Sequence, residues 1–496
     1  MSNEHLEQLY IYEKLHPAIT PEIAFQSYEL LDGDATQRKA EKTAFLANKV
    51  RNPSLDYLYA KGGQLKVSIA VLNKLLDETK SIKDEAVRNA VWDTISYRMA
   101  EMYWLLESKR LNEHFQDGVD CTKSLERFQE GSEALYGSVD TKLSARIYAE
   151  FFAQIKDKKL DEGSLKILAE LKHGFDMDVG DDHIAIPKIK DDDAFDRLPG
   201  NVKEILEPLR EVLLEEFHDI SDIIDEYYDE VCVRRPKDDP LHGKFNPHDM
   251  KVMFERVHEK RDPENKSRIS IQINESSSAL SWDTPTMSVV VGANRLPIAT
   301  KKEMLSKMVH EYGVHGMRAV NGQKTDLPIL GAGLYTDAGL GEQADYLTFE
   351  EGFATLCETA IMQEDIAWEP LYISRYLAVD ASRKGLDFRQ TFEQNWRIRA
   401  LMKVKDGEMM TPEIISKEKT QAYISCVRIR RGTPTKMISG NIPTFNKDLA
   451  YLKGKIIALE HLKEIGEDKE AIRYLFKGKF DPTNQLQNSL MKKYQT

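Results

Sequence analysis

Long apolar runs, a surplus of basic residues and paired cysteines are all missing from this 496-residue chain. No stretch approaches the roughly 18 apolar residues of a membrane-spanning helix, and the first residues lack the pattern of a signal peptide. The formal net charge of −13 argues against a nucleic-acid binder, because such proteins neutralise phosphates with a basic surface. The cysteines lack C-x-x-C spacing, which indicates reduced thiols: Cys121, Cys232, Cys357 and Cys426. We therefore expect a cytoplasmic protein that binds neither nucleic acid nor membrane.

Internal repeats and phosphate-binding loops are also absent, while helical periodicity is common. Residues 1–180 show apolar positions at helical spacing. The acidic residues 181–193 predict a surface loop. A single helix is predicted from 201 to 231, with a kink at Pro208. After a turn at 234–240 the pattern changes, since residues 268–273 and 287–291 are strand-like. We predict a mostly helical α+β fold, with a helical N-terminal region at 1–235 and a catalytic region with a small sheet at 236–496.

The stretch Val309-His310-Glu311-Tyr312-Gly313-Val314-His315 carries the strongest chemical signal. A catalytic zinc site uses three protein ligands and leaves a fourth position to water. His310, His315 and one glutamate can supply that set. Glu311 is then placed beside the metal without binding it, which is the position of the general base in H-E-x-x-H peptidases.

The spacing of the two histidines departs from that pattern by one residue. On an α-helix, positions i and i+5 differ by about 140°, whereas i and i+4 differ by about 40°. A single wide turn restores convergence, and such π-bulges often mark functional sites. Gly313 within the interval tolerates unusual backbone angles, and Thr300 with Glu303 predicts the start of the helix that carries the histidines.

The third ligand is predicted to come from the segment Glu350-Glu351-Gly352-Phe353-Ala354. Several zinc peptidases present a ligand from a glutamate that precedes such a small and apolar sequence at the start of a helix, and Glu351 has that position. Glu350 points about 100° away on a helix and is the first alternative. Glu342 and Asp345 are weaker candidates.

These residues resemble the tyrosine carboxypeptidase family, which includes microtubule-associated tyrosine carboxypeptidases and bacterial proteins named for a QEGLA motif. The family has H-E-x-x-x-H, a following Arg, an Asn-Gly turn and an E-E-G-L-A box, and the counterparts here are residues 310–315, Arg318, Asn321-Gly322 and residues 350–354, with Phe353 in place of Leu. A second block, in residues 427–432, 445–448 and 451–454, resembles the family's R-x-x-R-G, F-x-K-D and Y-L-x-G elements. The resemblance covers roughly residues 236–465.

The resemblance implies a zincin-like catalytic half with one zinc ion per chain and a metallocarboxypeptidase activity. The substrate is then a peptide or protein C-terminal tail, with a preference for an aromatic last residue such as tyrosine. A terminal carboxylate is best held by arginine, so Arg428 and Arg431 are the first candidates, with Lys447 and Tyr451 as further contacts. The alternative is that these arginines pair with acids such as Asp448.

Two other functions fit the same motif. One is a regulatory protein that keeps zinc without hydrolysis, which the general base Glu311 argues against. The other is an endopeptidase or a dipeptidyl peptidase with the same H-E-x-x-x-H site. Zinc peptidases commonly bind an extended substrate along a sheet edge, and the strands at 268–273 and 287–291 are the candidates for such an edge here. A purely supporting sheet is the alternative.

Overall fold

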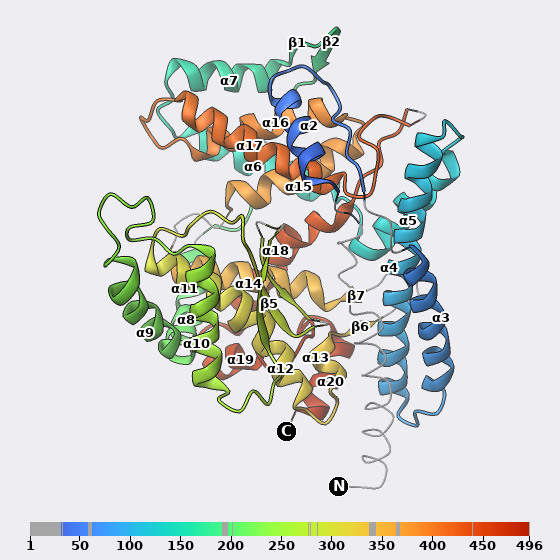
Figure 1. Ribbon diagram of the computed structural model, residues 1–496, viewed down its shortest axis with the longest axis vertical. Coiled ribbons are helices and arrows are strands. Elements are labelled where there is room, and N and C mark those ends of the chain that lie inside the picture. Colours follow the sequence, from blue (N-terminus) through green and yellow to red (C-terminus); the bar gives the residue numbers. More distant parts are fainter. Residues whose placement is uncertain are drawn as a thin grey trace.

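The computed structural model describes residues 31–495, apart from 32, 58–61, 191–196, 201, 276, 278, 285, 337–343, 364–367 and 439. Helices dominate it, and the strands form one three-stranded and two two-stranded sheets (Figure 1). The predicted mostly helical α+β fold is therefore confirmed. None of the described helices is both long and apolar enough to cross a bilayer.

The first part of the chain forms helices with capped starts. They are α2 (Ala35–Leu46), α3 (Gly62–Thr79), α4 (Glu85–Gln116), α5 (Thr122–Tyr136), α6 (Thr141–Lys156) and α7 (Glu162–His173). A carboxylate caps the N-terminus of four of them: Asp34 for α2, Asp84 for α4, Asp140 for α6 and Asp161 for α7. Each such cap satisfies a backbone N–H that the helix itself leaves unbonded.

Two predictions for the next segment were wrong. The acidic segment, expected as a loop, contains strand β2 (Asp182–Ile186), which pairs with β1 (Phe175–Val179) in an antiparallel hairpin. The single helix expected from 201 to 231 is divided at Phe217 into α8 (Val202–Glu216) and α9 (His218–Tyr227), which continues into the π-helix η3 (Tyr228–Cys232). Pro208 lies inside α8, so the division is elsewhere than at the proline.

The remaining elements build the region around the histidines. They are α10 (Pro247–Arg261), β3 (Ser270–Asn274), β4 (Leu280–Asp283), β5 (Ser288–Gly292), α11 (Lys301–Met308), η4 (Val309–Gly316), α12 (Met317–Gln323), α13 (Ile329–Ala332), β6 (Tyr335–Thr336), β7 (Ala344–Asp345), α14 (Tyr346–Met362), α15 (Pro370–Arg383), α16 (Phe388–Lys403), α17 (Pro412–Ile429), η6 (Asn446–Asp448), α18 (Leu449–Ile465), α19 (Lys469–Tyr474) and α20 (Gln485–Tyr494).

The three-stranded sheet has the order β3-β5-β4. Strand β5 is parallel to β3, with Ser270 opposite Ser288, and antiparallel to β4, with Leu280 opposite Val291. Both backbone edges of β5 are therefore occupied, so the strand predicted at 287–291 is not available to bind a substrate. The edges belong to β3 and β4, and the Trp282 ring of β4 packs against Gly316 of η4.

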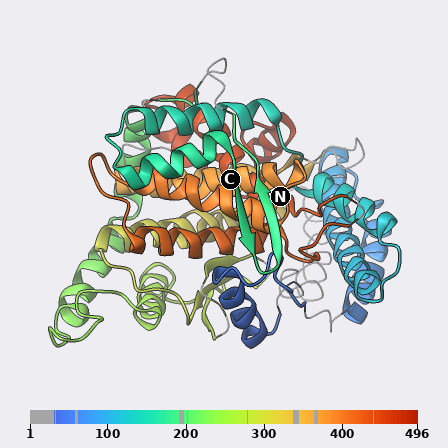
Figure 2. The same cartoon turned by 90° about the horizontal axis from the view of Figure 1, so that it is seen from above.

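The helices form three groups around two hydrophobic clusters, and the smaller of these contains the buried apolar residues of α3 to α5. Figure 1 places α6, α7 and α15 to α17 above the layer that contains α8 to α14, and Figure 2 shows α3 to α5, in blue to cyan, beside the orange helices. The largest hydrophobic cluster includes Phe45, Ile147 and Leu209 together with Phe353 and Leu459. It thus contains residues from both sides of position 235, and the division into domains at 235/236 stays a prediction.

Helices α14 and α18 cross at two glycines, Gly352 and Gly454. A Cβ on Gly352 would lie 1.9 Å from the Gly454 carbonyl carbon, and one on Gly454 would lie 1.8 Å from the Thr348 carbonyl oxygen. Only glycine fits such a close backbone approach. The two sequence blocks that carry the family resemblance therefore meet at this crossing.

Candidate metal centre

The histidines lie on a continuous helical rod whose middle part is π-helical. Helix α11 begins after Thr300, whose side chain accepts from the Glu303 backbone N–H at 3.0 Å, and it passes without a break into η4. Hydrogen bonds in a π-helix join residues five apart, so His310 and His315 share one face. Their ring centroids are 5.0 Å apart. The wide turn predicted from the spacing is confirmed.

The glycine within this turn has another role than the one predicted. Gly313 does not have a positive φ. A Cβ at this position would lie 2.9 Å from Cζ of Phe217, the residue at which α8 and α9 divide. Gly313 therefore makes room for a ring from a distant segment, and its backbone freedom is not used.

Glu351 completes a group of three possible ligands. One ligand atom from each of His310, His315 and Glu351 can be chosen so that all lie within 4.8 Å of one another. His315 Nε2 lies 3.9 Å from Glu351 Oε2. Of the alternatives for the third position, Asp345 caps α14 by accepting from the Thr348 backbone N–H at 3.0 Å, and Glu342 lies outside the described residues.

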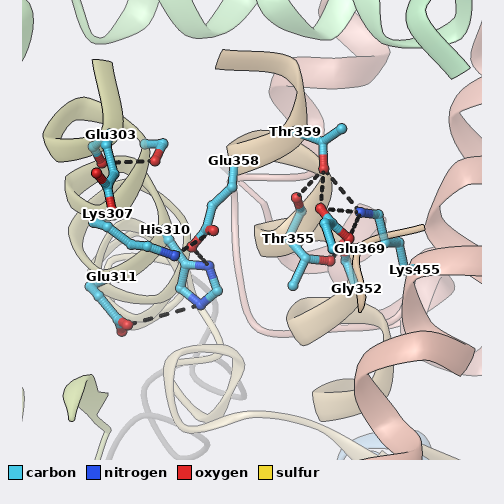
Figure 3. A network of polar contacts seen from close by, with 11 residues as sticks. Glu303, Lys307, His310, Glu311, Gly352, Thr355, Glu358, Thr359, Glu369 and Lys455 are labelled. Atoms are coloured by element: carbon cyan, nitrogen blue, oxygen red, sulfur yellow. Dashed lines mark hydrogen bonds and ion pairs between the residues drawn. The ribbon is translucent and has the colours of Figure 1, made fainter. Parts of the chain in front are cut away.

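The Nδ1 atom of each histidine lies close to a carboxylate. His310 Nδ1 lies 2.7 Å from Glu358 Oε1, and His315 Nδ1 lies 2.7 Å from Glu350 Oε1. Figure 3 shows the first pair, with Lys307 donating to Glu358 at 2.6 Å. Carboxylates in this position orient metal-binding imidazoles and leave Nε2 for the metal. Both Nε2 atoms are thus left to face the space beside Glu351.

Glu350 is the centre of a buried ionic network, which separates its role from that of Glu351. It accepts from Arg318 Nη1 at 2.9 Å and from Lys479 Nζ at 2.5 Å, and these three side chains are at most 1% exposed. Burial raises the pKa of Glu350, but Lys479 and Arg318 lower it more, so the carboxylate stays charged. Arg318 also donates to the backbone carbonyls of Gly478 and Phe480.

The rotation of α14 is held from its other side. Lys455 of α18 donates to both oxygens of Glu369, at 2.8 and 2.7 Å, and to the hydroxyl of Thr359 at 3.0 Å (Figure 3). These contacts join α14, α18 and the residue that precedes α15. Together with the close crossing at Gly352, they fix the rotation of α14 about its axis. The side chains of Glu350 and Glu351 therefore point in different, fixed directions.

The electrostatics of the site favour a bound cation. Burial lowers the pKa of His310, but Glu358 and Glu311 together raise it to about 9, because both carboxylates stabilise positive charge at this position. Burial raises the pKa of Glu311, which lies with an oxygen 4.0 Å from His310 Nε2. Two imidazoles and a carboxylate with orienting carboxylates behind them form a donor set suited to zinc.

Of the residues predicted to bind substrate, Lys447 and Tyr451 lie within electrostatic range of Glu351, and Arg428 is already paired. Arg428 donates to Asp448 through Nε at 2.9 Å and Nη2 at 2.6 Å, the ion pair considered as the alternative. Glu351 acts electrostatically on Lys447 and Tyr451, and Arg431 acts on Lys447. Burial lowers the pKa of Lys447 to about 8 and raises that of Tyr451 to about 12.

Three residues of this region were not found from the sequence. Glu358 lies seven positions after Glu351 on one helix, so the two-turn spacing is a signal that could have found it. Lys479 is 129 positions from Glu350, and its sequence context has no such signal. Arg375 of α15 lies 5.2 Å from the centroid of the Tyr451 ring and likewise had no local signal.

Residues 246–489 match the family described as microtubule-associated tyrosine carboxypeptidase. The match includes the histidines, α14, the second motif block and Lys479. No curated protein matches the sequence.

Proposed function

From its match over residues 246–489, the chain belongs to the microtubule-associated tyrosine carboxypeptidase family, and we propose that it is a zinc-dependent metallocarboxypeptidase. Membership in this family implies a peptide or protein substrate. The observation that carries the zinc proposal is the convergence of His310, His315 and Glu351 within 4.8 Å, with carboxylates behind both imidazoles. One zinc ion per chain would be held by these three side chains.

The proposed reaction removes the last residue of a peptide or protein tail. A bound zinc ion would lower the pKa of a water molecule to about 7 and polarise the scissile carbonyl. Glu311 would take a proton from the attacking water and later donate it to the leaving amine. Lys447, Arg428, Arg431 and Tyr451 surround the terminal residue, and an aromatic side chain such as tyrosine is preferred there.

The test separates metal binding from catalysis. Glu311→Gln keeps the shape of the side chain, so its zinc content, measured by elemental analysis, is expected to equal that of the wild type. Its rate of peptide hydrolysis should fall about 100- to 10,000-fold, because the general base is lost. Glu303→Gln makes the same change at the start of α11, outside the site, and should alter neither quantity.

A panel of peptides tests the specificity. Peptides that end in tyrosine, phenylalanine or alanine are offered with free and with amidated C-termini, and the released residue is identified by mass spectrometry. Release of single aromatic residues from free C-termini supports the proposal. Absence of zinc, hydrolysis by Glu311→Gln at the wild-type rate, or internal cleavage of amidated peptides would refute it and favour the regulatory or endopeptidase alternatives.

A further inference from the structure

Arg375 is a largely enclosed arginine with unused donors. Its side chain is 16% exposed, it makes no hydrogen bond with any residue that the structure describes, and its Nε is buried without a partner. The nearest carboxylate oxygen, Oδ2 of Asp448, lies 4.0 Å from Nε, beyond hydrogen-bonding distance. Removing a guanidinium from water without giving its donors partners costs free energy. A carboxylate of a ligand would supply the missing acceptor.

Asp448 accepts hydrogen bonds from Arg428 and forms only a distant ion pair with Arg375, at 4.0 Å. Its two oxygens accept from Arg428, at 3.1 and 2.9 Å from Nε and at 2.6 Å from Nη2. One carboxylate thus faces two guanidiniums, and one positive charge is left over. Burial and the charge of Arg428 lower the pKa of Arg375, and the charge of Asp448 offsets this only in part. A second anion would relieve this.

The surplus charge lies beside two tyrosines that interact electrostatically with carboxylates of the candidate metal centre. The Arg375 guanidinium is 5.2 Å from the centroid of the Tyr451 ring, and Tyr451 stacks on Tyr372 at 5.9 Å. The charge of Glu351 acts on Tyr451, and the charge of Glu358 acts on Tyr372. Each of the two tyrosines thus lies within electrostatic range of a carboxylate that belongs to the metal centre.

We propose that Arg375 binds the C-terminal carboxylate of the substrate, an inference that rests on the proposed carboxypeptidase function. A planar guanidinium holds a carboxylate with two parallel charge-assisted hydrogen bonds, and Arg375 has its donors unused. Arg428, held by Asp448, adds a fixed positive charge to the same place. The sequence favoured Arg428 as the anchor, but in the structure that residue already has a carboxylate.

The test measures binding, so that it does not depend on turnover. In zinc-loaded Glu311→Gln protein, calorimetry gives the affinity for a peptide that ends in tyrosine with a free C-terminus and for its amidated form. Arg375→Ala is expected to weaken binding of the free form about 100-fold, as for a lost contact between buried charges, and to leave the amidated form unchanged. A third peptide, in which upstream Asp and Glu become Asn and Gln, shows whether a side-chain carboxylate is bound instead.

Matched variants separate ligand binding from a structural role. Arg383→Gln alters an arginine of the same helix that pairs with Glu133 at the surface, and the preference for the free C-terminus should stay as in the wild type. Arg375→Leu should change the melting temperature little, because no hydrogen bond to a described residue is lost. Arg428→Leu should lower it, because Asp448, only 4% exposed, is left without its partner.

Three kinds of result would overturn the assignment. The first is a ratio of affinities for free and amidated peptides that is the same in Arg375→Ala as in the wild type. The second is binding that is lost only when the upstream acids of the peptide are neutralised, and the third is an Arg375→Leu protein that melts as low as Arg428→Leu or fails to fold. If the wild type hydrolyses free peptides and Arg375→Ala does so with the same KM, the inference fails and the proposed function stands. If no peptide is hydrolysed while Arg375 still governs the preference for the free C-terminus, the binding site stands and the proposed hydrolysis fails.

Discussion

Replacing Glu350 by glutamine is expected to weaken metal binding and the fold together. The carboxylate accepts from His315 Nδ1 at 2.7 Å, Arg318 Nη1 at 2.9 Å and Lys479 Nζ at 2.5 Å, all from nearly or fully buried side chains. Glutamine keeps the shape but leaves two buried cations without their shared counter-charge. Breaking a buried ion pair in this way costs about 3 to 5 kcal/mol of unfolding free energy.

The loss converts into a measurable shift. An unfolding entropy of about 2.1 cal/mol/K per residue amounts to about 1 kcal/mol/K for 496 residues, so the melting temperature should fall by about 3 to 5 °C. Zinc affinity, measured by competition with a chelator, should fall about 10- to 100-fold, because His315 loses the group that orients it. Glu358→Gln is the matched comparison: its partner Lys307 is 27% exposed, so zinc affinity should fall similarly and stability less.

The pH dependence has a definite sign. Lys479 and Arg318 hold the pKa of Glu350 below its usual range despite burial. Its contribution to stability is therefore fully present above the unfolded pKa of about 4.3 and is lost as the pH falls below it. Acid should destabilise the wild type more than Glu350→Gln over this range. A Glu350→Gln protein with a melting temperature within about 1 °C of the wild type and an unchanged zinc affinity would refute the reasoning.

Two further predictions concern the helix crossing and the basic residues. Gly352→Ala places a methyl group 1.9 Å from the Gly454 carbonyl carbon, so thermal unfolding should show a loss of about 3 kcal/mol or more of unfolding free energy. The control Gly63→Ala has open space at its Cβ and should be neutral or slightly stabilising. Equal effects of the two substitutions would contradict the close crossing. Burial lowers the pKa of Lys447 to about 8, so the cation is lost as the pH rises through that value. At higher pH the KM for peptides with a free C-terminal carboxylate should therefore increase. Lys447→Arg should flatten the rise, and a wild-type KM that is constant to high pH would exclude the contact.

Local features of the site were predictable because they depend on neighbouring residues. The interval of five between His310 and His315 required a wide turn, and η4 supplies it. Thr300 was predicted as the cap of the helix and accepts from Glu303. A cap and a turn are decided within a few residues, so sequence spacing is sufficient for them.

The choice between Glu350 and Glu351 was not decided by local pattern. Both lie in the second turn of α14, about 100° apart, and either could face the histidines if the helix were rotated. The rotation is set by the crossing at Gly352 and by Lys479, which comes from a segment 129 positions away. Such contacts depend on where distant segments lie, which periodicity does not encode.

The sheet and the helix division show the same limit. Strands at 268–273 and 287–291 were expected and correspond to β3 and β5, but β4 between them was missed and makes β5 the central strand. The helix expected to 231 is divided at Phe217, the residue whose ring packs on Gly313. Edge positions and helix breaks of this kind follow from pairing and packing between segments.

The sequence by itself determined the mostly helical α+β class, the pair of histidines with their wide turn, and the composition of the donor set. Only the tertiary structure decided that Glu350 accepts from His315 while Glu351 faces the histidines. It also decided that Arg428 donates to Asp448 and that Nε of Arg375 is left without a partner. The physical reason is the range of the interactions involved. Caps, turns and apolar stripes act over a few residues, whereas the partner of a buried charge is chosen by the packing of helices far apart in the chain.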